Sequence, residues 1–129
     1  MLSYFKQNRP LLEAINHARE NQDDFDALFD VLLKSRLTFA LTGPPEDRAS
    51  FEYLTHPDGL TLVAAYSDQW HARKSRQREI NGHLEIDSPI IFDLAGEEAG
   101  VIVNPFHKEN VILHPPAVRD LKSRYSEKP

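Results

Sequence analysis

A change of hydrophobic period between residues 88 and 105 constrains the fold of this chain more than any other feature. After Ser88-Pro89, apolar residues recur at helical spacing from Ile90 to Ala95, which predicts a helix capped by Ser88. The β-branched run Val101-Ile102-Val103 is too short for a helix and predicts a buried strand. We expect Gly100 to end the helix in a left-handed conformation and Asn104-Pro105 to turn out of the strand. Helices and strands therefore pack together in this chain.

Periodicity predicts the remaining elements in the same way. The expected helices are residues 10–19, a helix capped by Asp23 or Asp24, a short helix capped by Ser67, and a last helix from Pro115. The expected strands are residues 36–42, 50–54, 60–66 and 111–113, with an optional short strand at residues 84–86.

Two of these strands carry further expectations. Phe51 and Tyr53 should share one face of their strand, and residues 60–66 are apolar on both faces, as expected in the centre of a sheet. The element order is roughly αα-βββ-α-(β)-α-ββ-α. It predicts an α+β fold with a mixed or mostly antiparallel sheet and helices packed on it.

Length and composition limit the classes of protein to which the chain can belong. Its 129 residues fit a single domain, 1–129, with residues 1–9 and 126–129 frayed. The absence of cysteine removes disulfides, thiolate nucleophiles and cysteine-bound zinc. The sequence has neither an apolar run of ~20 residues nor a secretory signal pattern. We therefore expect a cytoplasmic protein that does not enter a membrane and carries no cofactor.

Charge is distributed unevenly along the chain. The net charge is −5, which argues against nucleic acid as a partner because phosphate contacts need a basic surface. Residues 20–30 contain five acidic residues and no basic one, whereas residues 73–78 contain four basic residues and no acidic one. Because the two segments have opposite charges, we expect that a homodimer could join the basic segment of one copy to the acidic segment of the other.

Five segments together resemble one bacterial family. They are Leu11-Leu12-Glu13-Ala14-Ile15, Leu32-Leu33-Lys34-Ser35, Tyr66-Ser67-Asp68, Phe92-Asp93-Leu94-Ala95, and Gly100 to Pro105. In this order they are similar to the N-terminal domain of the SseB family, named for enhanced serine sensitivity. The positions that carry the family pattern are Tyr66, Ser67, Gly100, Asn104 and Pro105.

The resemblance implies a broad class of function but no specific reaction. The usual second domain of the family has no counterpart here, so a single-domain member is expected. Members of this kind have no catalytic residues to carry over. The resemblance implies a non-enzymatic domain that acts as a protein-interaction or regulatory module, for example an immunity or accessory partner of a secreted protein. The alternative is a domain that senses a small molecule such as an amino acid, which would require a concave pocket with convergent polar groups.

Three residue groups suggest chemistry, and each has a simpler structural interpretation. Ser67, Asp68 and His71 supply the residue types of a catalytic triad, but they lie within one turn and favour a helix cap with an exposed histidine. A metal site would require His71, His83 and Asp87 to come together in space. The simpler interpretation is that the histidines are scattered over the surface.

The third group, Asn104-Pro105-Phe106, matches a short ligand motif of endocytic adaptor domains. Its position directly after a buried strand favours a turn.

The segment after residue 69 is the best candidate for partner binding. Trp70 precedes four basic residues, and tryptophan and arginine are enriched at interface hot spots. The basic residues are Arg73, Lys74, Arg76 and Arg78. Because no aromatic residues interleave them, an acidic protein surface is a better partner than nucleic acid. The alternative is that Trp70 packs in the core and the basic residues form a solvated face.

Overall fold

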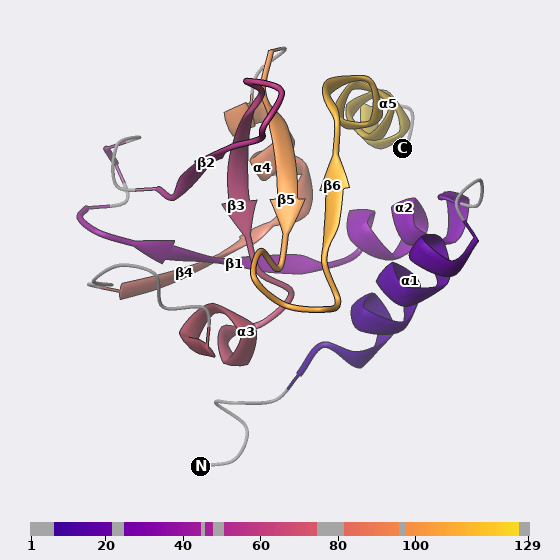
Figure 1. The fold of residues 1–129 in the computed structure, drawn as a ribbon, viewed down its shortest axis with the longest axis horizontal. Coiled ribbons are helices and arrows are strands. Elements are labelled where there is room, and N and C mark those ends of the chain that lie inside the picture. The colour runs from indigo at the N-terminus through magenta and orange to yellow at the C-terminus, as the bar shows by residue number, and fades with distance from the viewer. Residues whose placement is uncertain are drawn as a thin grey trace.

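The structure is a computed structural model that describes residues 7–21, 25–44, 46–47, 51–74, 82–95 and 98–126. Its elements follow the expected order (Figure 1). The helices are α1 (Arg9–Glu20), α2 (Asp26–Leu33), α3 (Gln69–Lys74), α4 (Ser88–Ala95) and α5 (Pro115–Ser126). The strands are β1 (Arg36–Leu41), β2 (Tyr53–Thr55), β3 (Thr61–Ala65), β4 (Gly82–Asp87), β5 (Gly100–Val103) and β6 (Val111–Leu113). The α+β prediction is therefore confirmed.

The strands form two hydrogen-bonded sheets. One has the order β2-β3-β5-β6, with β3 and β5 parallel and the outer pairs antiparallel, and the other is the antiparallel pair β1-β4. Among the residues that the structure describes, one isolated bridge joins them, in which Thr38 and Tyr66 exchange two backbone hydrogen bonds of 2.8 Å. The parallel pair requires a crossover, which α3, β4 and α4 supply. The expected central position of residues 60–66 is confirmed, because β3 lies between β2 and β5.

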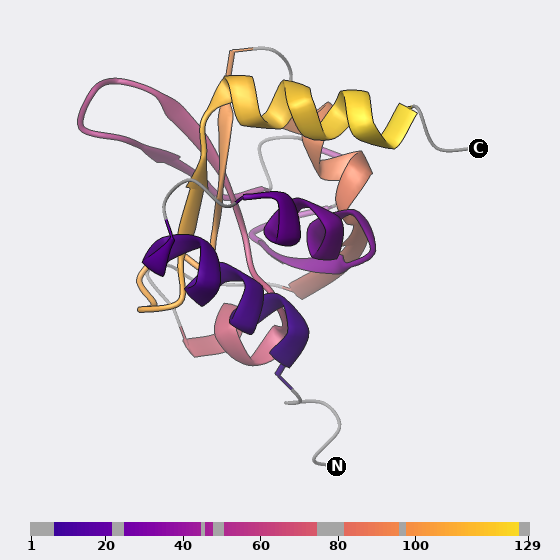
Figure 2. The same ribbon diagram turned by 90° about the vertical axis from the view of Figure 1, so that its right-hand side faces the viewer.

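Helices α2, α4 and α5 lie on one side of the four-stranded sheet (Figure 2). The main hydrophobic cluster lies between these helices and the strands, and it includes the buried side chains of Leu32, Phe39, Phe92, Val101 and Leu121. It also receives one face of α1, which packs on α2. A smaller cluster of Ala40, Tyr66 and Ala72 lies between β1 and α3. Within the described ranges, none of the helices has the length and hydrophobicity needed to cross a lipid bilayer.

Gly100 does not end a helix in a left-handed conformation; that expectation is wrong. It is the first residue of β5, and its φ is not positive. A Cβ added to Gly100 would lie 2.6 Å from the carbonyl oxygen of Leu113 and 2.9 Å from Leu62 Cδ2. Gly100 is therefore required by the close approach of β6 and β3 on either side.

Three smaller expectations also differ from the structure. Strand β2 begins at Tyr53, so Phe51 lies before the strand rather than on one face of it with Tyr53; Phe51 is buried and Tyr53 is 39% exposed. Ser88 directs its hydroxyl to the carbonyl of Leu32, which attaches α4 to α2 rather than capping α4. Helix α2 begins after Phe25, and Asp23 and Asp24 lie outside the described residues.

Candidate functional site

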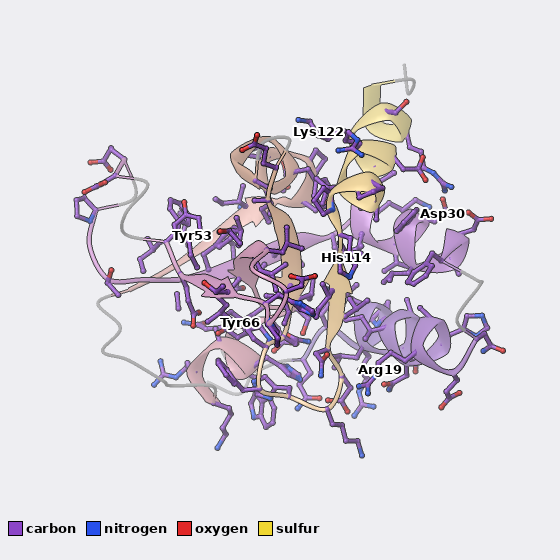
Figure 3. The ribbon with its side chains drawn as sticks, turned by 45° about the horizontal axis from the view of Figure 1, so that its top comes forward. Arg19, Asp30, Tyr53, Tyr66, His114 and Lys122 are labelled. Carbon is purple, nitrogen blue, oxygen red and sulfur yellow. The ribbon has the colours of Figure 1, made fainter. Side chains whose placement is uncertain are left out.

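Four of the five residues of the family pattern converge where two parallel strands end, whereas Gly100 lies at the start of β5. Tyr66 and Ser67 follow β3, and Asn104 and Pro105 follow β5. Because β3 and β5 are parallel, their carboxyl ends meet at one edge of the sheet, which is where open sheets of this kind commonly bind ligands. In Figure 3 the side chain of Tyr66 lies in the middle of this crowded region.

Asn104 connects the two strand ends through its side chain. Its Oδ1 accepts a hydrogen bond of 2.8 Å from Ser67 N–H, and its Nδ2 donates to Ser67 Oγ at 3.0 Å and to the carbonyl oxygen of Glu109 at 3.1 Å. The residue is completely buried and has a φ of 61°, a conformation that asparagine tolerates better than most residues. Asn104 therefore fixes the loop between β5 and β6 (residues 104–110) against the end of β3.

Asp68, and not Ser67, caps α3. Asp68 Oδ1 accepts from the backbone N–H of His71 at 2.9 Å, as an N-cap carboxylate does. The same carboxylate contacts His71 Nδ1 at 2.7 Å, and it accepts from Ser67 Oγ at 3.0 Å and from Asn8 N–H at 2.8 Å. Burial opposes ionisation of Asp68, but the hydrogen bonds from His71 and Asn8 outweigh it and hold the Asp68 pKa below its ordinary value.

His71 points inward and is 1% exposed, so the expectation of an exposed histidine is wrong. Its ring lies between two carboxylates, with Nδ1 on Asp68 and Nε2 at 3.8 Å from Glu109 Oε1. His107 Nε2 donates to the backbone carbonyl oxygen of His71 at 2.8 Å. We call Ser67, Asp68, His71, Asn104 and Glu109 the polar cluster.

The polar cluster does not have the geometry of a catalytic triad. A triad base uses one ring nitrogen for the acid and the other for the nucleophile. Here Asp68 Oδ1 and Ser67 Oγ face the same nitrogen, His71 Nδ1, at 2.7 and 3.5 Å. The arrangement therefore cannot pass a proton from Ser67 through the ring to Asp68, and it acts as a hydrogen-bonded cap.

The histidines do not form a metal site in the part of the chain that the structure describes, where no group of three or more histidine or carboxylate side chains is arranged to hold a metal ion. The side chain of His83, proposed above as a ligand, lies outside that part.

Trp70 lies over the polar cluster and is half-buried. Its ring centroid is 4.8 Å from that of His71 and 6.3 Å from that of His107. Lys74 Nζ lies 5.7 Å from the Trp70 ring centroid, within the range of a cation–π contact. Arg73 and Lys74 are exposed, and Arg76 and Arg78 lie outside the described residues. Trp70 is thus neither a core residue nor a free side chain.

The loop between β5 and β6 adds a residue that sequence reasoning did not assign to the site. Asn104-Pro105-Phe106 does form a turn, as expected, but Phe106 is 57% exposed and has a φ of 70°. The loop lies beside α3 in both ribbon views (Figures 1 and 2). We call Trp70, Lys74, Phe106 and His107 the aromatic surface. The Asn-Pro-Phe motif was the signal in the sequence, but it did not indicate that Phe106 would be exposed while Asn104 and Pro105 are buried.

A cleft of about 730 Å³ lies on the other side of Asp68. It is bordered by the start of α1, the end of α2, the start of α3 and the outer face of β1 and β4. Its lining residues are Gln7, Asn8, Pro10, Val31, Lys34, Ser35, Arg36, Thr38, Ser67, Asp68, Gln69 and Glu85.

Comparison with known proteins identifies a family. No curated protein and no solved structure gives a significant match to the chain. A family model, that of the SseB protein N-terminal domain, matches residues 11–120, from the first buried turn of α1 to the middle of α5. The match includes both strand ends and the whole polar cluster, and on this basis the chain belongs to the SseB N-terminal domain family.

Proposed function

We propose that this chain is a non-enzymatic protein-interaction module that binds its partner through the aromatic surface. The observation that carries the proposal is Phe106, an exposed aromatic residue in a left-handed conformation. That conformation costs a non-glycine residue about 1–2 kcal/mol. Strained backbone held by the surrounding structure tends to occur at functional positions.

The surface has the composition of an interface hot spot. Tryptophan is strongly enriched at such spots, and here Trp70 is half-buried with its ring centroid 6.3 Å from that of His107, in the loop that carries the exposed Phe106. The polar cluster beneath holds both elements in place through Asn104 and Asp68. Rigid side chains lose little conformational entropy when a partner binds, which favours affinity.

Charge indicates the chemistry of the partner. Arg73 and Lys74 are exposed on α3, and Lys108 is exposed on the adjoining loop. An acidic partner surface with an apolar centre complements this arrangement, and opposite charges accelerate association. An immunity or accessory partner of a secreted protein would use a surface of this kind.

A pull-down from the native cell lysate tests the proposal with a matched pair of variants. Phe106→Ser removes an exposed apolar side chain from the aromatic surface, and Ile90→Ser removes one from α4, where Ile90 is 51% exposed. We expect wild type and Ile90→Ser to capture the same protein, and Phe106→Ser and Trp70→Ala to lose it. Equal capture by all four folded proteins would contradict the proposal.

Sedimentation of the purified chain distinguishes a foreign partner from a second copy. Helix α2 carries exposed acidic residues, Asp26 and Asp30, which complement Lys74. Self-association at low salt that disappears at high salt and in Lys74→Glu would identify the second copy as the partner. If the chain is a monomer under all conditions, the proposed partner is a different acidic protein.

A further inference from the structure

The cleft has a strand edge as part of its floor. Thr38 directs both its N–H and its carbonyl oxygen to Tyr66 and away from β4. In an antiparallel pair this orientation alternates with every residue, so Arg36, two positions earlier, directs its backbone groups to the same edge as Thr38. The pairing does not continue past Tyr66. Asp68, which would face Arg36 next, instead accepts a hydrogen bond of 3.2 Å at its carbonyl oxygen from Ala72 N–H in α3. The edge of β1 is therefore open to the cleft at Arg36.

The cation at the end of α2 is available for a ligand. Lys34 is exposed, and within the described residues no ion pair or hydrogen bond engages its ammonium group. Arg36 contacts Asp87 at 3.5 Å and Glu85 at 4.0 Å, but its side chain is 60% exposed and such pairs contribute little. Both cations lie where the edge of β1 begins.

The acidic group on the opposite wall is already satisfied. The carboxylate of Asp68 has four polar contacts, with Asn8 N–H, Ser67 Oγ, His71 N–H and His71 Nδ1. It has no remaining need for a cationic ligand. Glu85, the other acidic residue of the lining, lies 4.0 Å from Arg36 Nη1, so these two charges offset each other and the remaining charge that the cleft offers to a ligand is that of Lys34.

The lining favours an extended chain over a small metabolite. Small-molecule sites are mostly apolar and enclose most of the ligand. Here Pro10 and Val31 are the only two of the twelve described lining residues with apolar side chains. Peptides that add to a strand edge gain affinity from backbone hydrogen bonds and need only a few side-chain contacts.

We propose that this cleft binds an extended acidic peptide segment, which pairs its backbone with Arg36 at the edge of β1 and places a carboxylate on Lys34. The site is separate from the aromatic surface, because Asp68 and the start of α3 lie between them. The two proposals can therefore succeed or fail independently.

Nuclear magnetic resonance titration of the ¹⁵N-labelled full chain tests this proposal. The probe is the acetylated and amidated heptapeptide Thr-Val-Glu-Val-Glu-Val-Thr, and the control peptide has lysine in place of both glutamates. We expect the acidic probe to shift the amide signals of Arg36, Asn8 and Gln69. The lysine peptide should leave them unchanged because Lys34 repels it.

Two charge-reversal variants locate the carboxylate contact. Lys34→Glu should weaken binding of the acidic probe at least about fivefold, since an attraction becomes a repulsion. Arg19→Glu is the matched control: Arg19 is also exposed near the carboxyl end of a helix, at the end of α1 away from the cleft (Figure 3). We expect it to bind the probe as wild type does.

Three outcomes would overturn the proposal. In the first, the acidic probe leaves the signals of Arg36 and its neighbours unchanged at millimolar concentration. In the second, Lys34→Glu and Arg19→Glu bind the probe equally. In the third, free glutamate gives the same shifts at the same concentration as the peptide, which would assign the cleft to a small molecule.

Discussion

The hydrophobic cluster under α4 and α5 and the polar cluster at the ends of β3 and β5 are both buried, but they are held together in different ways. Phe92 and Leu121 belong to a large cluster of apolar side chains, and burial of apolar surface does not depend on particular pairs of atoms. Asn104 and Asp68 bind particular atoms, and each loss leaves a buried polar group without its partner. The first kind of burial determines whether the chain folds, and the second determines the position of the surfaces above it.

The largest expected effect is in the hydrophobic cluster. Phe92→Ala should lower the free energy of unfolding by about 3–5 kcal/mol, because the side chain is fully buried and leaves a cavity. Ile90→Ala, on the exposed face of the same helix, should change it by less than about 1 kcal/mol. Urea unfolding measures both values. Similar losses in the two variants would show that α4 is not packed as described.

A smaller loss is expected from Gly100→Ala. The added Cβ would meet the Leu113 carbonyl oxygen at 2.6 Å, and backbone cannot move aside as a flexible side chain can. We expect a destabilisation of about 1–3 kcal/mol, typical of overpacking. Gly59→Ala provides the contrast: its Cβ would meet nothing within 4 Å, so its cost comes only from its φ of 94°. A stable Gly100→Ala would contradict the close approach of β6.

In the polar cluster, Asn104 can be tested with two substitutions. Asn104→Ala should cost about 2–4 kcal/mol, because Ser67 N–H and Oγ lose a buried partner and alanine disfavours a φ of 61°. Asn104→Gly removes the same hydrogen bonds without the backbone strain. Thermal unfolding should therefore rank wild type above glycine and glycine above alanine. If the two variants were equally stable, the left-handed backbone would not contribute.

The pH dependence of stability should distinguish Asp68 from an exposed carboxylate. The folded-state pKa of Asp68 is lower than its ordinary value of 3.8, so its stabilisation is complete above that pH and is lost as the pH falls through the folded-state pKa. Asp68→Asn should be less stable than wild type near pH 6, and the difference should shrink below about pH 3.8. A difference that stays constant with pH would contradict a charged Asp68.

Asp58 is the exposed control residue for this measurement. A hydrogen bond from Leu60 N–H lowers its pKa, but Asp58 lies in an exposed turn. Solvent screens its interactions, so Asp58→Asn should show a smaller dependence on pH than Asp68→Asn.

The smallest effect is expected at the aromatic surface. Lys74→Gln should change stability by about 0.5–1 kcal/mol at most, since it removes one exposed cation–π contact with Trp70. The same substitution should shift the emission of Trp70, the single tryptophan of the chain. Loss of partner capture with unchanged stability would place Lys74 in binding rather than in folding.

The hydrophobic cluster follows from the sequence far better than the polar cluster does. The helices and strands appear where residues of period 3.6 and period 2 recur, because each needs one apolar face. The orientation of His71 could not be predicted in this way, since it depends on Asp68 and Glu109 arriving from different parts of the chain. The role of Gly100 also depends on β6, which follows it by more than ten residues.

The separation of the partners along the chain also explains why the candidate site could be predicted only in part. Tyr66, Ser67, Asn104 and Pro105 could be picked out as pattern residues, but their meeting required the parallel pairing of β3 and β5. Phe106 could be read as part of a turn, whereas its exposure is a property of the folded loop.

The hydrogen bonds between Ser67 and Asn104 join residues 37 positions apart, and this separation has a consequence for synthesis of the chain. A ribosome releases residues in order, so Ser67 emerges well before its partner exists. The aromatic surface cannot assemble until α3, β4, α4 and β5 have all emerged and the crossover has closed. An incomplete chain therefore lacks this surface, and a partner that recognises it would bind only the completely synthesised and folded chain.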